Sequence, residues 1–200
     1  MIAATGAAGS GGMTRRGLLA CAAAGGASLA LGGCATGWGI GSASRIDQRV
    51  NVTRDYLLQT YPAAGPMVQG AEGVLYMPLM TEVALGTGGA YGEGALRVRD
   101  QTVDYYSAAL ATLGLQAGAQ QYAHALIFRT PEALSAFRAS PGWVAGAGAF
   151  YALPTGGMDM GADTLALQYP IVAMIFGQSG LMAGASIEGT KYTRITLNRR

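Results

Sequence analysis

The order of apolar and polar positions predicts a helix ahead of a strand-rich region. Apolar side chains recur at helical spacing from Ser44 to about Tyr61, which indicates one buried face. Ser44 and Asp47 stand three residues apart, as in a capping box, and Pro62 ends the segment. The predicted apolar face comprises Ile46, Val50, Leu57 and Leu58, and the other side carries Arg45, Arg49 and Arg54.

Beyond Glu72 the apolar residues alternate with a period of two, which is typical of half-buried strands. We expect strands near residues 73–79, 82–91, 93–99, 103–112, 115–129, 143–153, 170–177, 181–188 and 190–197. A helix over 131–138 interrupts them, with Thr130 as its N-cap and Pro131 at its first position. The predicted fold class is α+β and β-dominated. It combines an N-terminal amphipathic helix with a curled antiparallel sheet, either a sandwich or a small barrel, and one inserted helix.

Three short segments of the strand region share the pattern Gly-[Leu/Trp]-x-Ala-Gly-Ala. They lie at residues 114–119, 142–147 and 180–185. In a strand, a period of two places the glycines on one face, where another layer can approach closely or the sheet can bend. Trp143 in the middle segment has small neighbours, so we expect its indole to fill the core.

Composition excludes several classes of protein. Half of the 200 residues are hydrophobic and 12% are charged, which argues against a disordered chain. The 32 glycines follow no three-residue period, which excludes a collagen-like chain. The formal charge of +2 comes from Arg15 and Arg16 near the N-terminus. The rest of the chain has no net field to attract nucleic acid, and we expect no nucleic-acid partner.

A basic pair, an apolar run and a cysteine occupy the N-terminal segment in that order. Arg15 and Arg16 precede the apolar residues, and Leu31-Gly32-Gly33-Cys34 resembles a bacterial lipobox. We therefore expect Cys34 to carry the lipid that anchors the mature protein. The predicted organisation is a start-site artefact (1–12), a signal peptide (13–33), a flexible tether (34–43) and a single domain (44–198).

Alternatives remain at this segment. The apolar run of 17 residues from Gly17 to Gly33 is marginal as a membrane-spanning helix. The basic pair partly matches a twin-arginine signal, so both the Sec and the Tat route stay open. Ala35 after the cysteine favours the periplasmic face of the outer membrane, because an aspartate there resembles the signal for retention at the inner membrane.

Residues able to carry catalysis are scarce. His124 is the only histidine and lies in a predicted strand, so zinc sites built from Cys and His are excluded by count. The glycine-rich segment 86–94 has Tyr91 where a dinucleotide loop needs its third glycine. Asp159 and Asp163 are too sparse to form a calcium loop. We therefore expect a protein that is not an enzyme and that has no cofactor and no metal.

Several motifs in the same order resemble the SYLF domain family. They are Gly89–Leu96, Gly114–Gln120, Gly142–Trp143 and Gly180–Lys191, and the resemblance covers about residues 45–197. It implies phospholipid binding, with phosphoinositides as ligands of eukaryotic members and actin binding in some. Bacterial relatives are mostly lipoproteins, which agrees with the lipobox, and actin binding is not expected in a bacterial envelope.

Four basic residues of the strand region are candidates for contact with a lipid headgroup. Arg97 and Arg99 are two residues apart, so in a strand both would point to one side and form a paired fork for phosphate. Lys191 and Arg194 would lie on opposite faces of the last strand, so at most one could join them. The alternative for the pair is an ordinary solvated face.

These expectations favour a membrane-anchored envelope lipoprotein whose domain binds phospholipid or another amphiphile without catalysis. The expected partners are membrane lipids. The alternative is a structural or partner-binding envelope lipoprotein without a small ligand, including an assembly of the glycine-zipper type.

Overall fold

The computed structural model describes residues 42–146, 149–152, 168–180 and 186–197. The chain divides into two compact units, residues 1–40 and 41–200, and all the described residues belong to the second. Cys34, the signal segment and the tether up to residue 41 lie outside the described residues, as do Asp159 and Asp163. Among the helices of the described part, none is long and apolar enough to cross a membrane.

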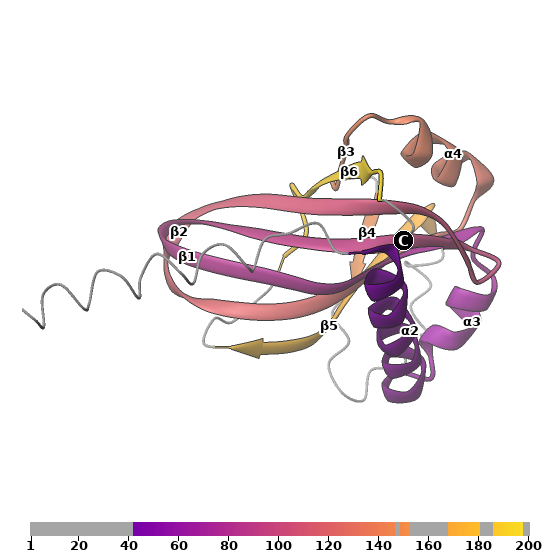
Figure 1. Ribbon diagram of the computed structural model, residues 1–200, viewed down its shortest axis with the longest axis horizontal. Coiled ribbons are helices and arrows are strands. Elements are labelled where there is room, and N and C mark those ends of the chain that lie inside the picture. The colour runs from indigo at the N-terminus through magenta and orange to yellow at the C-terminus, as the bar shows by residue number, and fades with distance from the viewer. Residues whose placement is uncertain (1–41, 147–148, 153–167, 181–185, 198–200) are drawn as a thin grey trace, which may run out of the picture. The chain divides into compact units, whose positions relative to one another are not determined.

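The described elements begin with two helices and continue as strands with one helix between them (Figure 1). In chain order they are α2 (Ala43–Thr60), α3 (Ala64–Gln69), β1 (Gly73–Val98), β2 (Gln101–Phe128), α4 (Pro131–Ala139), β3 (Trp143–Val144), β4 (Ala149–Ala152), β5 (Ile171–Gly180) and β6 (Lys191–Ile195). The β-dominated α+β class is therefore confirmed.

Helix α2 forms as predicted, but its start differs. Ser42 is the N-cap, and its side chain makes no capping hydrogen bond. The capping box of Ser44 and Asp47 is wrong, because the Asp47 carboxylate faces the sheet. It accepts hydrogen bonds from Thr102 Oγ1 and from the Tyr105 hydroxyl, each at 2.7 Å. Asp47 thus connects the helix to β2.

One antiparallel hairpin of two long strands dominates the sheet. β2 pairs with β1 along one edge and with β5 and β6 along the other, and the strand order is β3-β6-β2-β5-β4 with β1 beside β2. Only β4 and β5 are parallel. Several of the short strands that alternation predicted are segments of β1 and β2. Among the strands of the described residues the sheet is not closed, so it is a curled open sheet and not a small barrel.

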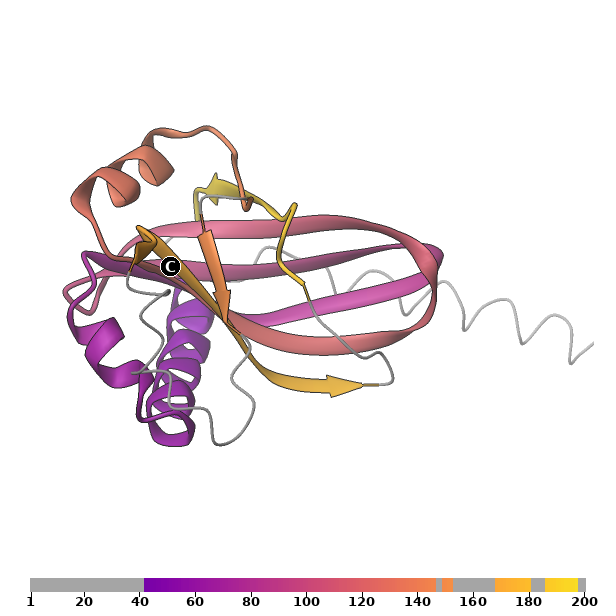
Figure 2. The ribbon, with the colours of Figure 1, turned by 180° about the vertical axis from the view of Figure 1, so that it is seen from behind.

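The hairpin folds back on itself at its middle. The register between β1 and β2 shifts between Leu85 and Thr87, where Gly86 has a φ of 77°. Both strands bend at the end of the sheet opposite α3 and α4 (Figures 1 and 2). A Cβ on Gly94 would lie 2.0 Å from the Tyr76 carbonyl oxygen, so the two halves of β1 approach at backbone distance. A side chain at residue 94 would prevent this approach.

Alternate side chains of β1 enter two different cores. Val74 and Tyr76 pack beneath α2 with Ile127. Leu75 and Met77 belong to the core that includes the α4 side chain Phe137. Burial on both faces of the sheet explains why residues 73–77 form a continuous apolar run.

The second predicted helix is confirmed as α4. The Thr130 hydroxyl oxygen accepts a hydrogen bond from the Ala133 backbone N–H at 3.2 Å, as an N-cap should. Trp143 packs against the core that includes Phe137, as expected, but it is only partly buried. Its ring centroid lies 5.5 Å from that of Phe137 and 5.7 Å from that of Tyr192, at the edge of the core.

The three glycine segments do not occupy equivalent positions. The first lies within β2, the second starts before β3 and passes beyond it, and the third begins with Gly180, the last residue of β5. Gly180 lies against β2, because a Cβ there would be 2.4 Å from the Ala119 carbonyl oxygen. Gly92 and Gly94 of β1 are also closely packed, and their Cβ atoms would meet the carbonyl oxygens of Leu79 and Tyr76. Close approach at glycine is therefore observed at Gly180 of the third segment and at two glycines of β1 outside the segments, and Gly146 of the second segment has nothing within 4 Å of a Cβ.

Candidate functional site: a basic pocket beside helix α2

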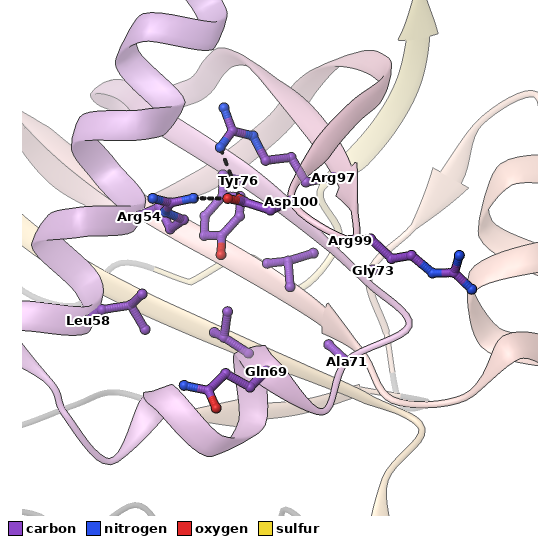
Figure 3. Close-up of a pocket in the computed structure, with 11 residues that line it drawn as sticks. Arg54, Leu58, Gln69, Ala71, Gly73, Tyr76, Arg97, Arg99 and Asp100 are labelled. Carbon is purple, nitrogen blue, oxygen red and sulfur yellow. Dashed lines mark hydrogen bonds and ion pairs between the residues drawn. The ribbon is translucent and has the colours of Figure 1, made fainter.

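A pocket of about 380 Å³ lies between α2, α3, the start of β1 and the β1–β2 turn. Its apolar wall includes Leu58, Val68, Val74 and Tyr76, and its charged side comprises Arg54, Arg97, Arg99 and Asp100. Figure 3 shows the guanidinium groups of Arg54 and Arg97 converging on Asp100. We call this the basic pocket.

Arg97 is the buried cation of the basic pocket. The residue is 7% exposed. Its Nη2 donates to Asn51 Oδ1 of α2 at 2.6 Å, and its Nη1 donates to Asp100 Oδ1 at 3.2 Å. The remaining polar atom, Nε, has no hydrogen-bond partner among the described residues. Arg97 lies on the face of β1 that α2 covers, which explains its burial.

Asp100 connects the two arginines from the β1–β2 turn. Its Oδ2 accepts a hydrogen bond from Arg54 Nη1, and its Oδ1 accepts the bond from Arg97. The hydrogen bond from Arg54 is the main cause that lowers the pKa of Asp100, and the same bond raises the pKa of Arg54. Asp55 also pairs with Arg54, at 3.0 Å. At neutral pH the site therefore holds charged groups of both signs.

Tyr76 supplies an uncharged polar group to the same pocket. Burial raises the pKa of Tyr76 to about 12, so the phenol keeps its proton at neutral pH. Its ring is the part of the apolar wall next to the charged side, and the hydroxyl points toward Leu58 and Gln69 (Figure 3). The pocket thus offers cations, a hydroxyl and aliphatic carbon within one concavity.

The predicted fork of Arg97 and Arg99 does not form. β1 ends at Val98, and Arg99 and Asp100 form a two-residue turn with φ angles of 51° and 62°. Positive φ at both central residues is typical of a type I′ hairpin turn. The alternation that was expected to place Arg97 and Arg99 on one side therefore stops before Arg99. Both line the pocket, but the Arg99 side chain points away from Arg97 (Figure 3).

The other two candidates, Lys191 and Arg194, do not join the pocket. The guanidinium group of Arg194 lies 3.7 Å from Asp104, and it donates to the backbone carbonyl of Arg138 in α4. The exposed Lys191 side chain runs past Gly142. Arg194 therefore contacts α4 and Lys191 lies beside the residue that precedes β3, whereas Arg97 contacts α2.

Sequence reasoning missed Arg54 as a pocket residue. In α2, Asp47, Asn51 and Arg54 follow one another at helical spacing, and each bonds to a residue of the β1–β2 hairpin. This polar stripe beside the apolar face could have indicated from the sequence that Arg54 contacts another element. It could not reveal which residues of the hairpin the stripe contacts.

Polar residues also lie in the core that includes Phe137. His124 is fully buried, and its Nε2 forms a hydrogen bond of 2.8 Å with the Tyr192 hydroxyl. Burial lowers the pKa of His124 to about 3, so the ring is neutral at neutral pH. Gln120 donates to the buried Glu82 carboxylate at 2.7 Å. Within the described ranges, no group of three or more His, Cys, Asp or Glu residues is placed to hold a metal ion.

A second surface lies on the other flank of α2. Val52, Tyr56 and Leu79 line a shallow pocket of about 240 Å³ and are 66%, 45% and 37% exposed. Farther along β1, Val83 and Leu85 are 50% and 83% exposed. Val83 and Leu85 are separated from Leu79 by an even number of positions in β1, so all three side chains lie on the same face of the sheet. We call these five residues the apolar patch.

The folded hairpin, its glycine contacts and the covering helices define a β-dominated α+β domain, and comparison with known families gives a match. Residues 109–200 match the family model Ysc84, described as Las17-binding protein actin regulator. The match confirms the resemblance to the SYLF domain family over residues 109–200. Helix α2 and the basic pocket residues precede the matched segment. No curated protein matches the chain.

Proposed function

We propose that this protein is a membrane-anchored envelope lipoprotein whose SYLF domain binds phospholipid or another amphiphile without catalysis. The observation that carries the proposal is the basic pocket, which places guanidinium groups beside an aliphatic wall. An amphiphile presents the same two chemistries to a protein. The proposed location is the periplasmic face of the outer membrane.

The charged side of the pocket suits phosphate oxygens. Guanidinium groups present planar N–H donors that match phosphate and carboxylate geometry. Arg54 and Arg97 converge from α2 and β1, and Arg99 stands at the rim. The adjoining wall of Leu58 and Val68 would contact the first carbons of the ligand. Burial of these carbons adds about 25 cal/mol for each Å² removed from water.

The expected anchor would bring the apolar patch close to lipid. If Cys34 is acylated, the seven residues 35–41 separate it from Ser42, and they span at most about 25 Å when fully extended. A tether of this length would keep the domain near the membrane surface that holds the anchor, where the patch could contact lipid. Large exposed apolar patches commonly mark membrane or protein contacts.

The test of the ligand is native mass spectrometry of the acylated protein purified in mild detergent. We expect non-covalent phospholipid adducts beyond the mass of the covalent acyl chains. The double variant Arg54→Ala/Arg97→Ala should lose these adducts, while Arg194→Ala, which removes an arginine of β6 outside the pocket, should keep them. A parent protein that retains no lipid would favour the alternative of a partner-binding lipoprotein.

The test of the anchor is metabolic labelling with a fatty acid. We expect label in the parent protein and none in Cys34→Ser. Cys21→Ser is the matched control, because Cys21 lies within the expected signal peptide and would be removed with it. Label in Cys34→Ser, or loss of label in Cys21→Ser, would contradict acylation at Cys34.

A further inference from the structure

We propose that Asp100 is a built-in anionic occupant of the basic pocket, which the phosphate group of an incoming ligand displaces. The inference rests on the proposed function, because it concerns the same site. It adds a specific role for the β1–β2 turn: the turn holds the two pocket arginines in place until a ligand arrives.

The geometry of Asp100 imitates that of a bound anion. One carboxylate oxygen accepts from Arg54 and the other accepts from Arg97, at 3.2 Å. Two oxygens of one phosphate group can bridge two guanidinium groups in the same way. Asp100 therefore occupies the position between the arginines that a phosphate ligand needs.

Arg97 and Asp100 differ in burial in the way that displacement of Asp100 by a phosphate group requires. The Arg97 side chain is 8% exposed, whereas the Asp100 side chain is 60% exposed. A buried cation without a counter-charge is costly, so Arg97 needs an anion in place at all times. Asp100 can return to water with little loss once another anion is in place, because its carboxylate is already largely in contact with water.

The turn allows the exchange without refolding of the hairpin. Asp100 and Arg99 hold positive φ angles in the two-residue turn, and only rotation of the Asp100 side chain is needed to free the arginines. Arg99 lines the same pocket and makes no ion pair with another described residue. It can therefore supply a third positive charge when a phosphate group enters. Asp55 remains beside Arg54 in both states.

The test compares Asp100→Asn with the parent, both as the chain from Ala35 onward without the acyl group. This chain contains every described element. Asparagine keeps the size of the side chain and accepts positive φ. The matched control is Asp104→Asn, which removes the same charge beside Arg138 and Arg194. If Asp100→Asn does not fold, Asp100→Gly serves the same purpose, because glycine also accepts this backbone conformation.

Two probes distinguish a free anion from a lipid headgroup. The first is inorganic phosphate, followed by the thermal midpoint. The second is phosphatidylcholine vesicles with and without phosphatidic acid, followed by flotation. For Asp100→Asn we expect a lower midpoint without phosphate and a larger rise on its addition than in the parent. We also expect about tenfold tighter binding to the anionic vesicles, which corresponds to ~1.4 kcal/mol. Asp104→Asn should bind like the parent.

The outcomes separate the inference from the proposed function. If the parent binds anionic vesicles and Asp100→Asn binds them equally or more weakly, Asp100 is not a displaceable occupant, while lipid binding stands. If neither protein binds anionic vesicles, retains lipid or responds to phosphate, the proposed function fails, and the inference fails with it. A response to phosphate without a response to vesicles would support the exchange at Asp100 with a free anion as ligand.

Discussion

Arg97 is both buried and charged, so its removal should lower the stability of the domain and also abolish lipid binding. In Arg97→Ala, Asp100 keeps Arg54 and its contact with water, but the Asn51 side chain loses a partner. We expect a loss of about 1–2 kcal/mol in the free energy of unfolding, measured in urea. Lipid adducts should disappear. The control Arg99→Ala changes an exposed turn residue and should stay within about 0.5 kcal/mol of the parent.

His124 predicts an acid sensitivity of the fold. Its folded pKa of about 3 lies below the usual value of 6.5, so the unfolded chain binds a proton at a higher pH than the folded protein. The stability from neutral His124 is fully present above pH 6.5 and decreases as the pH falls toward 3. By pH 5 the decrease should be on the order of 2 kcal/mol.

The measurement for His124 is urea unfolding between pH 7 and pH 4, compared with His124→Gln. Glutamine can still bond to the Tyr192 hydroxyl but does not titrate in this range. The variant should lose less stability on acidification than the parent does. Parallel pH profiles for the two proteins would show that His124 is not responsible.

At the scale of elements, the folding of β1 onto itself depends on Gly94. A Cβ at this residue would lie 2.0 Å from the Tyr76 carbonyl oxygen, and a backbone oxygen cannot move aside as a side chain can. Gly94→Ala should therefore cost about 3 kcal/mol of unfolding free energy, measured in urea. The control is Gly65→Ala in α3, where a Cβ would meet nothing within 4 Å. It should be neutral or stabilising by up to ~1 kcal/mol. Equal stability of the two variants would exclude the close approach as a determinant of the fold.

The elements show which parts of the fold could be predicted from the sequence. The residues of α4 were predictable because Thr130 and Pro131 provide a local start signal. The continuity of β1 was not, because Gly86 with its positive φ resembles a turn but produces a bend within one strand. The break between the predicted strands 93–99 and 103–112 located the β1–β2 turn. Its two-residue form was not predictable, because Arg99-Asp100 lacks the glycine that usually marks such a hairpin.

At the scale of the whole domain, the basic pocket depends on contacts between distant segments. Arg54 and Asp100 are 46 positions apart in the sequence, as are Asn51 and Arg97. The sequence identified Arg97 and Arg99 by their charge and spacing, but the packing of α2 against the hairpin decides which cations converge. Periodicity describes one element at a time, so it could not supply Arg54 or exclude Lys191 and Arg194.

The apolar patch leads to a prediction about how the domain meets a membrane. Val83 and Leu85 are exposed on the face of the sheet that adjoins α2, beyond the part that the helix covers. In the chain from Ala35 without the acyl group, Val83→Asp/Leu85→Asp should weaken flotation with anionic vesicles, because two charges would enter the interface. We expect at least a tenfold loss, or ~1.4 kcal/mol.

The control for the patch is Val144→Asp, which places a charge at another exposed valine, in β3. This variant should float like the parent, and all three proteins should share one thermal midpoint, because none of the substituted residues is buried. The basic pocket is unchanged in these variants, so inorganic phosphate should raise the midpoint of each by the same amount. Flotation of Val83→Asp/Leu85→Asp at the level of the parent would mean that the patch does not contact lipid. The basic pocket would then account for membrane binding without a second contact surface.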